Sequence, residues 1–205
     1  MGELPKQRIM RAMIQSNFRR QFRQCMLICM TLTITILTAT IAAQTDDQAA
    51  LERNVKAAFI YKFTNYIEWP QNSFSQPDTP LTIAVMGDDQ LAAELNQLVS
   101  GRIVNGRPIA VRKIQDIEPS IAINILFVGH NESARLNEVV GALQARPILI
   151  VTESEGSLTQ GSIINFLVID GHVRFEIAQN SAEKRGLKLS SRLLAVAQNV
   201  QTETP

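Results

Sequence analysis

Histidines are the first place to look for metal or acid-base chemistry, and this chain of 205 residues has only two, His130 and His172. Each stands beside an expected turn, far from the other in the sequence. A zinc site needs three or four ligands at spacings that close around the ion. No such set surrounds either histidine, so we expect no metal site and no cofactor.

Phosphate binding is the second chemistry to test, and the sequence has neither a G-x-G-x-x-G nor a Walker A motif. The nearest candidate is Gly87-Asp88-Asp89, which follows an apolar run. A helix N-terminus attracts anions, but two carboxylates at that place would repel them. We therefore predict that Asp88 is the N-cap of a helix.

Three polar segments, 87–89, 129–133 and 152–156, follow predicted strands, and α/β sheets bind ligands at the carboxyl ends of their strands. A small-ligand pocket there is one hypothesis. An exported hydrolase that uses His130 and an unrecognised serine is another, although no serine stands in a nucleophile-elbow sequence. The simpler interpretation of 129–133 is a helix-capping loop with Asn131 or Ser133 as the cap. Glu153 and Glu155 could be paired carboxylates, but two acids after a strand are usually just solvated.

Charge divides the chain unevenly. The whole has 20 Lys and Arg against 19 Asp and Glu, but residues 1–43 carry six basic side chains and one acid. An uncharged run from 24 to 45 follows the arginines and passes through Ile41-Ala42-Ala43. We expect a signal peptide over 1–43, cleaved after Ala43, and export to the periplasm; the alternative is a retained membrane anchor. The balanced composition argues against a nucleic-acid binder.

Both cysteines, Cys25 and Cys29, fall within the predicted signal. The mature chain is then without thiols, which excludes disulfides and cysteine nucleophiles. We expect residues 44–205 to form a single domain whose stability comes from its core.

The elements that must hold these residues begin with an amphipathic helix over 48–68, ended by Trp69-Pro70. Its apolar positions fall at helical spacing, with Glu52, Lys56 and Lys62 around the remaining surface. Strands and helices then alternate, which indicates right-handed crossovers in a largely parallel sheet. The expected strands are 81–86, 109–114, 123–128 and 147–152, and the expected helices are centred on 91–99 and 136–143.

The C-terminal third departs from this alternation. Two apolar runs, 162–169 and 172–177, flank Asp170-Gly171, which is a strong hairpin signal. A closing helical region, broken at Gly186, follows, and its last piece places apolar residues from 189 to 200 near one face with Ser190-Ser191 inside the helix. The predicted fold class is therefore α/β, with a largely parallel central sheet flanked by helices and an antiparallel hairpin near the C-terminus.

Several motifs spread along the mature chain resemble the YfiR-like family of small periplasmic proteins. The first and most specific run is VKAAFIYKFTNYIEWP at 55–70, and GLKLSSRLL at 186–194 closes the series. Between them come NGRPI at 105–109, ILFV at 125–128, GSIINF at 161–166 and VRFEI at 173–177. The family commonly has a cysteine where this chain has Ile123 and an asparagine where it has Ala178.

The resemblance implies a non-enzymatic α/β regulator, expected to be a homodimer. Such a protein binds the periplasmic domain of a membrane-bound diguanylate cyclase or sensor kinase and inhibits it, which lowers cyclic di-GMP signalling and biofilm formation. The absence of the cysteine suggests that redox does not control it.

The candidate partner- or ligand-binding residues lie in the first motif and in VRFEI. Tyr61 and Trp69 have large apolar bodies with polar ends, which suit a core or an interface, and Glu68 precedes the tryptophan. Arg174 and Glu176 alternate with apolar residues and share a strand face. They are available to a partner if that face is exposed and form a structural ion pair if a helix covers it.

Overall fold

The computed structural model describes residues 47–118, 121–143 and 146–202. The predicted signal peptide and both cysteines lie outside these residues. The chain divides into units 1–49 and 50–205, and the second unit contains the sheet described below. No helix in the described ranges has the length and apolar character needed to cross a membrane.

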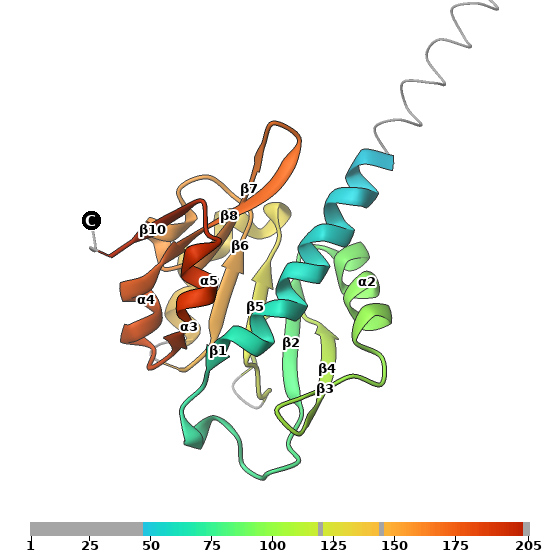
Figure 1. The fold of residues 1–205 in the computed structure, drawn as a ribbon, viewed down its shortest axis with the longest axis vertical. Helices are drawn as coiled ribbons and strands as arrows, with labels where there is room; N and C mark the ends of the chain where they lie inside the picture. The colour runs from blue at the N-terminus through green and yellow to red at the C-terminus, as the bar shows by residue number, and fades with distance from the viewer. Residues whose placement is uncertain (1–46, 119–120, 144–145, 203–205) are drawn as a thin grey trace, which may run out of the picture. The chain divides into compact units, whose positions relative to one another are not determined.

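The described residues of this unit form an eight-stranded sheet in the order β10-β8-β7-β6-β5-β2-β4-β3 (Figure 1). Neighbouring strands from β4 through β7 are parallel, and β8 turns back antiparallel to β7. The predicted α/β class with a C-terminal hairpin is confirmed. The strands are β2 (Leu81–Met86), β3 (Ile103–Val104), β4 (Arg107–Lys113), β5 (Ile125–Val128), β6 (Leu149–Thr152), β7 (Ile164–Ile169), β8 (His172–Ala178) and β10 (Asn199–Gln201).

The central strands form because their residues are apolar and mostly β-branched, and every residue of β2, β5 and β6 is buried. Strands covered on both faces have this continuous pattern rather than an alternating one. Each face of the sheet therefore supports its own apolar cluster.

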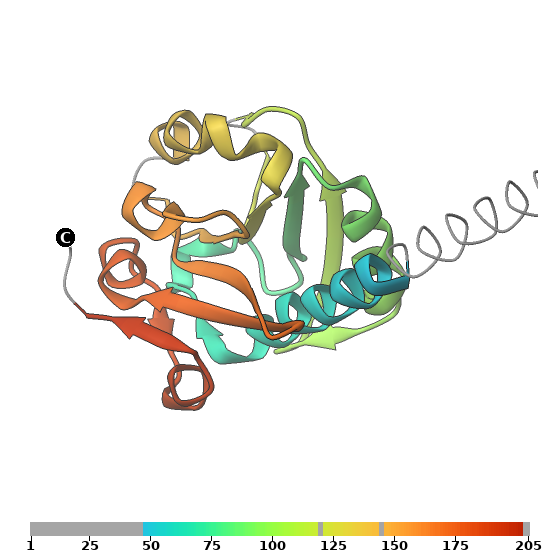
Figure 2. The same cartoon turned by 90° about the horizontal axis from the view of Figure 1, so that it is seen from above.

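Helices supply the cover for both faces (Figure 2). The N-terminal helix, described from 47 to 66, and α2 (Asp89–Val99) contribute buried side chains to one cluster. The helix α3 (Leu136–Leu143), which follows the 3-10 helix η2 (His130–Arg135), contributes to the other. Phe59 and Phe63 of the N-terminal helix pack against Phe166 and Phe175 of the hairpin, with ring centroids 5.3 to 6.1 Å apart.

Two-residue turns connect both hairpins. Asp170 and Gly171 have φ values of 50° and 73° and join β7 to β8, as predicted. Asn105 and Gly106, with φ values of 51° and 78°, join β3 to β4, so the second strand begins at Arg107 rather than at residue 109. Positive φ at both central residues matches the twist of the paired strands.

The prediction for the C-terminal end was wrong in one respect: the expected helix over 189–200 is broken into three elements. These are β9 (Lys188–Leu189), α5 (Ser191–Ala195) and β10. Ser190 is the N-cap of α5, and its Oγ accepts the N–H of Leu193 at 3.3 Å. Val200 lies in a strand parallel to β8, because pairing with the sheet edge outweighs helical periodicity there. Gly186 follows the preceding helix, α4 (Gln179–Lys184).

The N-terminal helix also ends earlier than predicted. Ile67–Glu68 forms β1, which pairs antiparallel with β9 in a separate two-stranded ladder. The N–H of Ser190 donates to the carbonyl of Tyr66 at 2.9 Å. The motifs at 55–70 and 186–194 thus contact each other. The remaining short elements are the 3-10 helices η1 (Gln71–Ser73) and η3 (Ser157–Gln160).

Candidate functional site

The carboxyl ends of β2, β5 and β6 meet at the point where the strand order reverses. The chain leaves β2 for β4 on one side and returns to β5 on the other. Open α/β sheets bind ligands in the crevice at such a switch point. The segments 87–89, 129–133 and 152–156 are therefore brought to one edge of the sheet.

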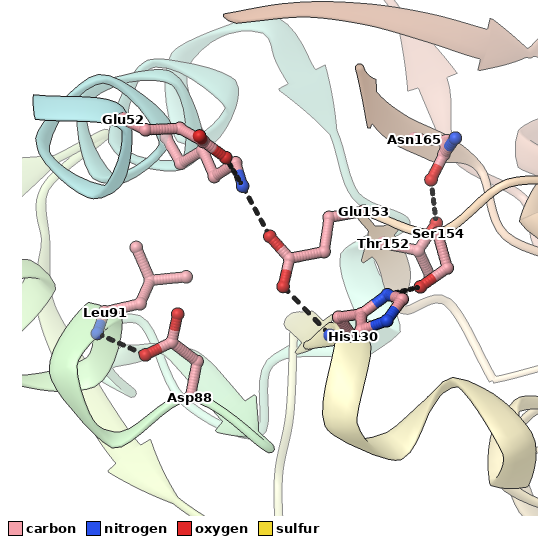
Figure 3. A network of polar contacts seen from close by, with 9 residues as sticks. Glu52, Asp88, Leu91, His130, Thr152, Glu153, Ser154 and Asn165 are labelled. Atoms are coloured by element: carbon pink, nitrogen blue, oxygen red, sulfur yellow. Dashed lines mark hydrogen bonds and ion pairs between the residues drawn. The ribbon is translucent and has the colours of Figure 1, made fainter. Parts of the chain in front are cut away.

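Glu153 is the centre of a polar network at this edge (Figure 3). Its Oε2 accepts the Nζ of Lys56 at 2.6 Å, and its Oε1 accepts the backbone N–H of His130 at 2.9 Å. Lys56 also donates to Oε1 of Glu52, one helical turn earlier. This network links the N-terminal helix to the ends of β5 and β6.

Lys56 and Glu153 are mostly removed from solvent, with side chains 9% and 13% exposed, whereas Glu52 is 30% exposed. Burial lowers the pKa of Lys56, but its hydrogen bonds to Glu153 and Glu52 and their charges outweigh burial, so the pKa lies above its usual value of 10.5. The lysine is therefore charged at neutral pH. A buried charge without partners would be very costly, so the two carboxylates are required by the lysine.

His130 and Ser154 are the pair that could support nucleophilic chemistry. Nδ1 of His130 lies 3.2 Å from Oγ of Ser154. A working serine–histidine pair needs a carboxylate to orient the imidazole through its other nitrogen. Glu153 instead binds the backbone N–H of His130 and the ammonium of Lys56. Within the described residues no group of three metal-ligating side chains is present either.

The loops after β2 and β5 pack directly against each other. A Cβ atom placed on Gly129 would lie 3.1 Å from the carbonyl carbon and oxygen of Gly87. Nδ2 of Asn131 donates to the Gly87 carbonyl at 3.3 Å. These two loops therefore contact each other directly at this edge. A groove of about 450 Å³ lies beside them between α2 and β4 and includes Asp89, and another of about 270 Å³ lies along the N-terminal helix.

The capping predictions have mixed outcomes. Oδ1 of Asp88 accepts the N–H of Leu91 at 2.9 Å, so its role as the N-cap of α2 is confirmed. Asn131 and Ser133 do not cap: η2 begins after Gly129 with no side-chain cap. The amide of Asn131 is used to join the two loops instead.

A second polar network runs beneath the first, through buried side chains. Oγ1 of Thr152 lies 2.9 Å from Oγ of Ser162 and donates to Oδ1 of Asn165 at 2.8 Å. Nδ2 of Asn165 then donates to Oε1 of Glu176 at 3.1 Å. Burial makes unpaired polar groups costly, so this network fixes the register of β6, β7 and β8.

Arg174 and Glu176 share a face of β8, as the alternation predicts, but no ion pair or hydrogen bond joins them among the described residues. Arg174 is exposed and Glu176 is half-buried. The cross-strand neighbour of Arg174 is Leu167, and that of Glu176 is Asn165. Arg174 is therefore available to a partner, whereas Glu176 is held by Asn165.

The remaining three candidates lie on the N-terminal helix and directly after it, where Glu68 and Trp69 are neighbours in the chain. The guanidinium of Arg102 lies 4.8 Å from the centroid of the Tyr61 ring. Glu68 is exposed and pairs across the β1–β9 ladder with Lys188. Trp69 is half-buried against the core, and its Nε1 has no hydrogen-bond partner in the described part of the chain. The five predicted residues do not form one cluster.

Lys56 has a role that the sequence pattern did not indicate. The pattern predicts it on the outer surface of the helix, but the whole residue is only 7% exposed. The signal was present in the spacing, because Lys56 stands four residues before Ile60 and seven before Phe63, both fully buried. Glu153 was expected to be solvated, and its burial corrects that; Glu155 is exposed as expected.

Two solved structures illustrate the similarity of the fold, which is distant in both. A conserved domain protein from Vibrio cholerae has a TM-score of 0.46 at 11% identity, over 58% of this chain and 54% of that chain. The ABC domain from Streptococcus pneumoniae in complex with L-Trp has a TM-score of 0.44 at 11% identity, over 58% and 55%. The match thus spans about half the length of each, and similarity at this level supports no statement about function.

Comparisons of sequence are more informative. No curated protein matches the chain. The model of the YfiR/HmsC-like family matches residues 53–198, which include most of the N-terminal helix, every strand of the eight-stranded sheet except β10, and the β1–β9 ladder. The chain therefore belongs to the YfiR/HmsC-like family.

Proposed function

We propose that this protein is an exported, dimeric regulator that binds the periplasmic domain of a membrane-bound diguanylate cyclase or sensor kinase and inhibits it. Cyclic di-GMP and biofilm formation then fall when the regulator is bound. The protein acts by binding another protein and performs no catalysis of its own.

The observation that carries this proposal is the family match over 53–198. It covers nearly all of the described residues. The motifs 55–70 and 186–194 support it further, because they meet at β1 and β9 rather than lying in unrelated places. The segments that match the family model are therefore the ones that build the core of the fold.

The chemistry of the carboxyl edge also favours a binding protein. The groups that could act on a substrate there are already engaged: Glu153 accepts Lys56 and the His130 N–H, and Asn131 donates to Gly87. Groups held by one another in this way stabilise a scaffold. The arginine-rich start followed by an uncharged run supports export.

Two measurements test the proposal. Deletion of the gene should raise cellular cyclic di-GMP, because the cyclase loses its inhibitor. The tagged mature domain should also capture a cyclase or sensor kinase from detergent-solubilised membranes, identified by mass spectrometry. Unchanged cyclic di-GMP together with no such membrane protein would contradict the proposal.

Variants locate the contact once a partner is captured. Arg174→Ala removes an exposed side chain from β8, so its melting temperature should not change. Reduced capture would then place Arg174 at the interface. Arg192→Ala, an exposed arginine on α5, is the matched control and should leave capture unchanged.

A further inference from the structure

The outer edge of the sheet is open along most of β4. The short strand β3 pairs with β4 only at Arg107 and Pro108. In the ranges that the structure describes, no strand lies beside Ile109–Lys113 on the side away from β2. Figure 1 shows β4 and β3 at this end of the sheet, beside α2.

The direction of the backbone groups follows from the pairing with β2. The N–H of Ile114 donates to the carbonyl of Val85 at 3.0 Å. Backbone groups alternate in direction along a strand, so the N–H and C=O groups of Val111 and Lys113 point outward. Such a row of outward groups is a template for another strand.

A groove runs along this edge between β4 and α2. Its volume is about 450 Å³, and it is lined by Asp89, Ala92, Ala93, Asn96, Val111 and Lys113. The two alanines leave room that larger side chains would fill. The exposed ion pair of Lys113 and Asp89, 3.1 Å apart, marks one end. The groove can therefore accept a side chain from a strand added to β4.

The charge of the edge selects among possible occupants. Arg112 is exposed and has no hydrogen bond or ion pair within the described residues. Two further cations lie on the same strand: Arg107 donates to the carbonyls of Gln76 and Thr79, and Lys113 pairs with Asp89. A second copy pairing through its own β4 would bring two basic strands together, and like charges on adjacent strands are unfavourable. An acidic strand would be complementary.

We propose that the β4–α2 groove binds an extended acidic segment of a partner protein by strand addition. Main-chain hydrogen bonds to Val111 and Lys113 hold the segment, and one apolar side chain enters the groove. Carboxylates of the segment neutralise Arg112 and its neighbours. The inference rests on the proposed function only in taking the partner to be a protein.

The test uses the predicted mature chain, residues 44–205, and two fluorescein-labelled peptides, Glu-Val-Glu-Val-Glu-Val and Lys-Val-Lys-Val-Lys-Val. Fluorescence anisotropy should show that the acidic peptide binds about tenfold more tightly than the basic one, with the difference falling as salt is added. Equal affinity for both peptides, or no binding of either, would overturn the proposal.

Two variants separate strand addition from other modes of binding. Val111→Pro removes the outward N–H, and Val111→Ala removes most of the same side chain while keeping that N–H. The acidic peptide should bind the proline variant about tenfold more weakly than the alanine variant. Equal binding to both would refute strand addition.

Two further readouts keep the proposal testable. If thermal melting shows that Val111→Pro is unfolded, the Arg112→Glu variant is titrated in its place. This variant should bind the basic peptide more tightly than the acidic one. If Val111→Pro instead dissociates a dimer seen by light scattering, the edge is a contact between copies and the proposal is wrong. No cyclase enters these titrations, so their failure is distinct from failure of the proposed function.

Discussion

The carboxyl edge around Glu153 and the outer edge along β4 belong to one sheet but differ in how they treat polar groups. At the carboxyl edge, the side chains of Lys56 and Glu153 are mostly buried and contact each other across two elements. At the outer edge, Lys113 is 61% exposed, its partner Asp89 at the start of α2 is 81% exposed, and backbone groups of β4 point outward. We infer that the buried network stabilises the fold and that β4 is available for binding.

This difference reverses the usual expectation for an α/β sheet, in which the switch point holds the ligand. Here the lysine of the N-terminal helix occupies that place. Substitutions at the carboxyl edge should therefore change stability, and substitutions at β4 should leave it almost unchanged. The four predictions below test this contrast.

The largest effect is expected for Glu153→Ala. It leaves Lys56 buried with only Glu52 and leaves the His130 N–H without its acceptor. The free energy of unfolding should fall by about 3 kcal/mol, measured by urea denaturation. Glu155→Ala, two residues away and exposed, is the control and should stay within about 0.5 kcal/mol. Equal effects of the two would show that the network does not stabilise the fold.

Gly129→Ala should lower the free energy of unfolding by about 1 to 3 kcal/mol. The new Cβ would lie 3.1 Å from the backbone of Gly87 and force the loops apart. Gly141→Ala is the matched control: it lies in α3 with nothing within 4 Å of the added Cβ. Because alanine has a higher helix propensity than glycine, the free energy of unfolding of this control should rise by about 1 kcal/mol. Thermal melting of both variants checks the sign of each change.

A smaller change should follow the titration of Lys56. Its pKa is raised on folding, so its contribution is complete below the usual value of 10.5 and is lost as pH rises through the folded-state pKa. The melting temperature of the wild type should therefore fall more steeply above that pH than that of Lys56→Met. Between about pH 6 and 9 the difference between the two should stay constant. A difference that changes between pH 6 and 8 would contradict this assignment.

The smallest effect is expected at the open edge. Asp89→Ala removes an exposed ion pair with Lys113, and such pairs contribute at most about 0.5 to 1 kcal/mol. The melting temperature should shift by no more than about 4 °C. A larger fall would mean that the pair supports the α2–β4 packing, which would remove the contrast between the two regions.

The sequence by itself determined the elements whose signals are local. Leu81–Met86 is a strand because a short β-branched run is flanked by turn residues, and Asp170-Gly171 is a turn because its residues accept positive φ. Asp88 caps α2 for the same kind of reason, since its side chain bonds the N–H of Leu91, which is only three residues further along the chain. Family membership also followed from sequence, through motifs that are continuous in the chain.

Tertiary structure alone decided which polar groups are paired. Lys56 and Glu153 are 97 residues apart, and only the docking of the N-terminal helix over the carboxyl edge brings them together. Val200 joins a strand instead of a helix because the edge of β8 lies beside it. The outward groups of Val111 and Lys113 depend on β3 ending early. These outcomes come from long-range contacts, whose free energy exceeds the local preferences that a sequence pattern records.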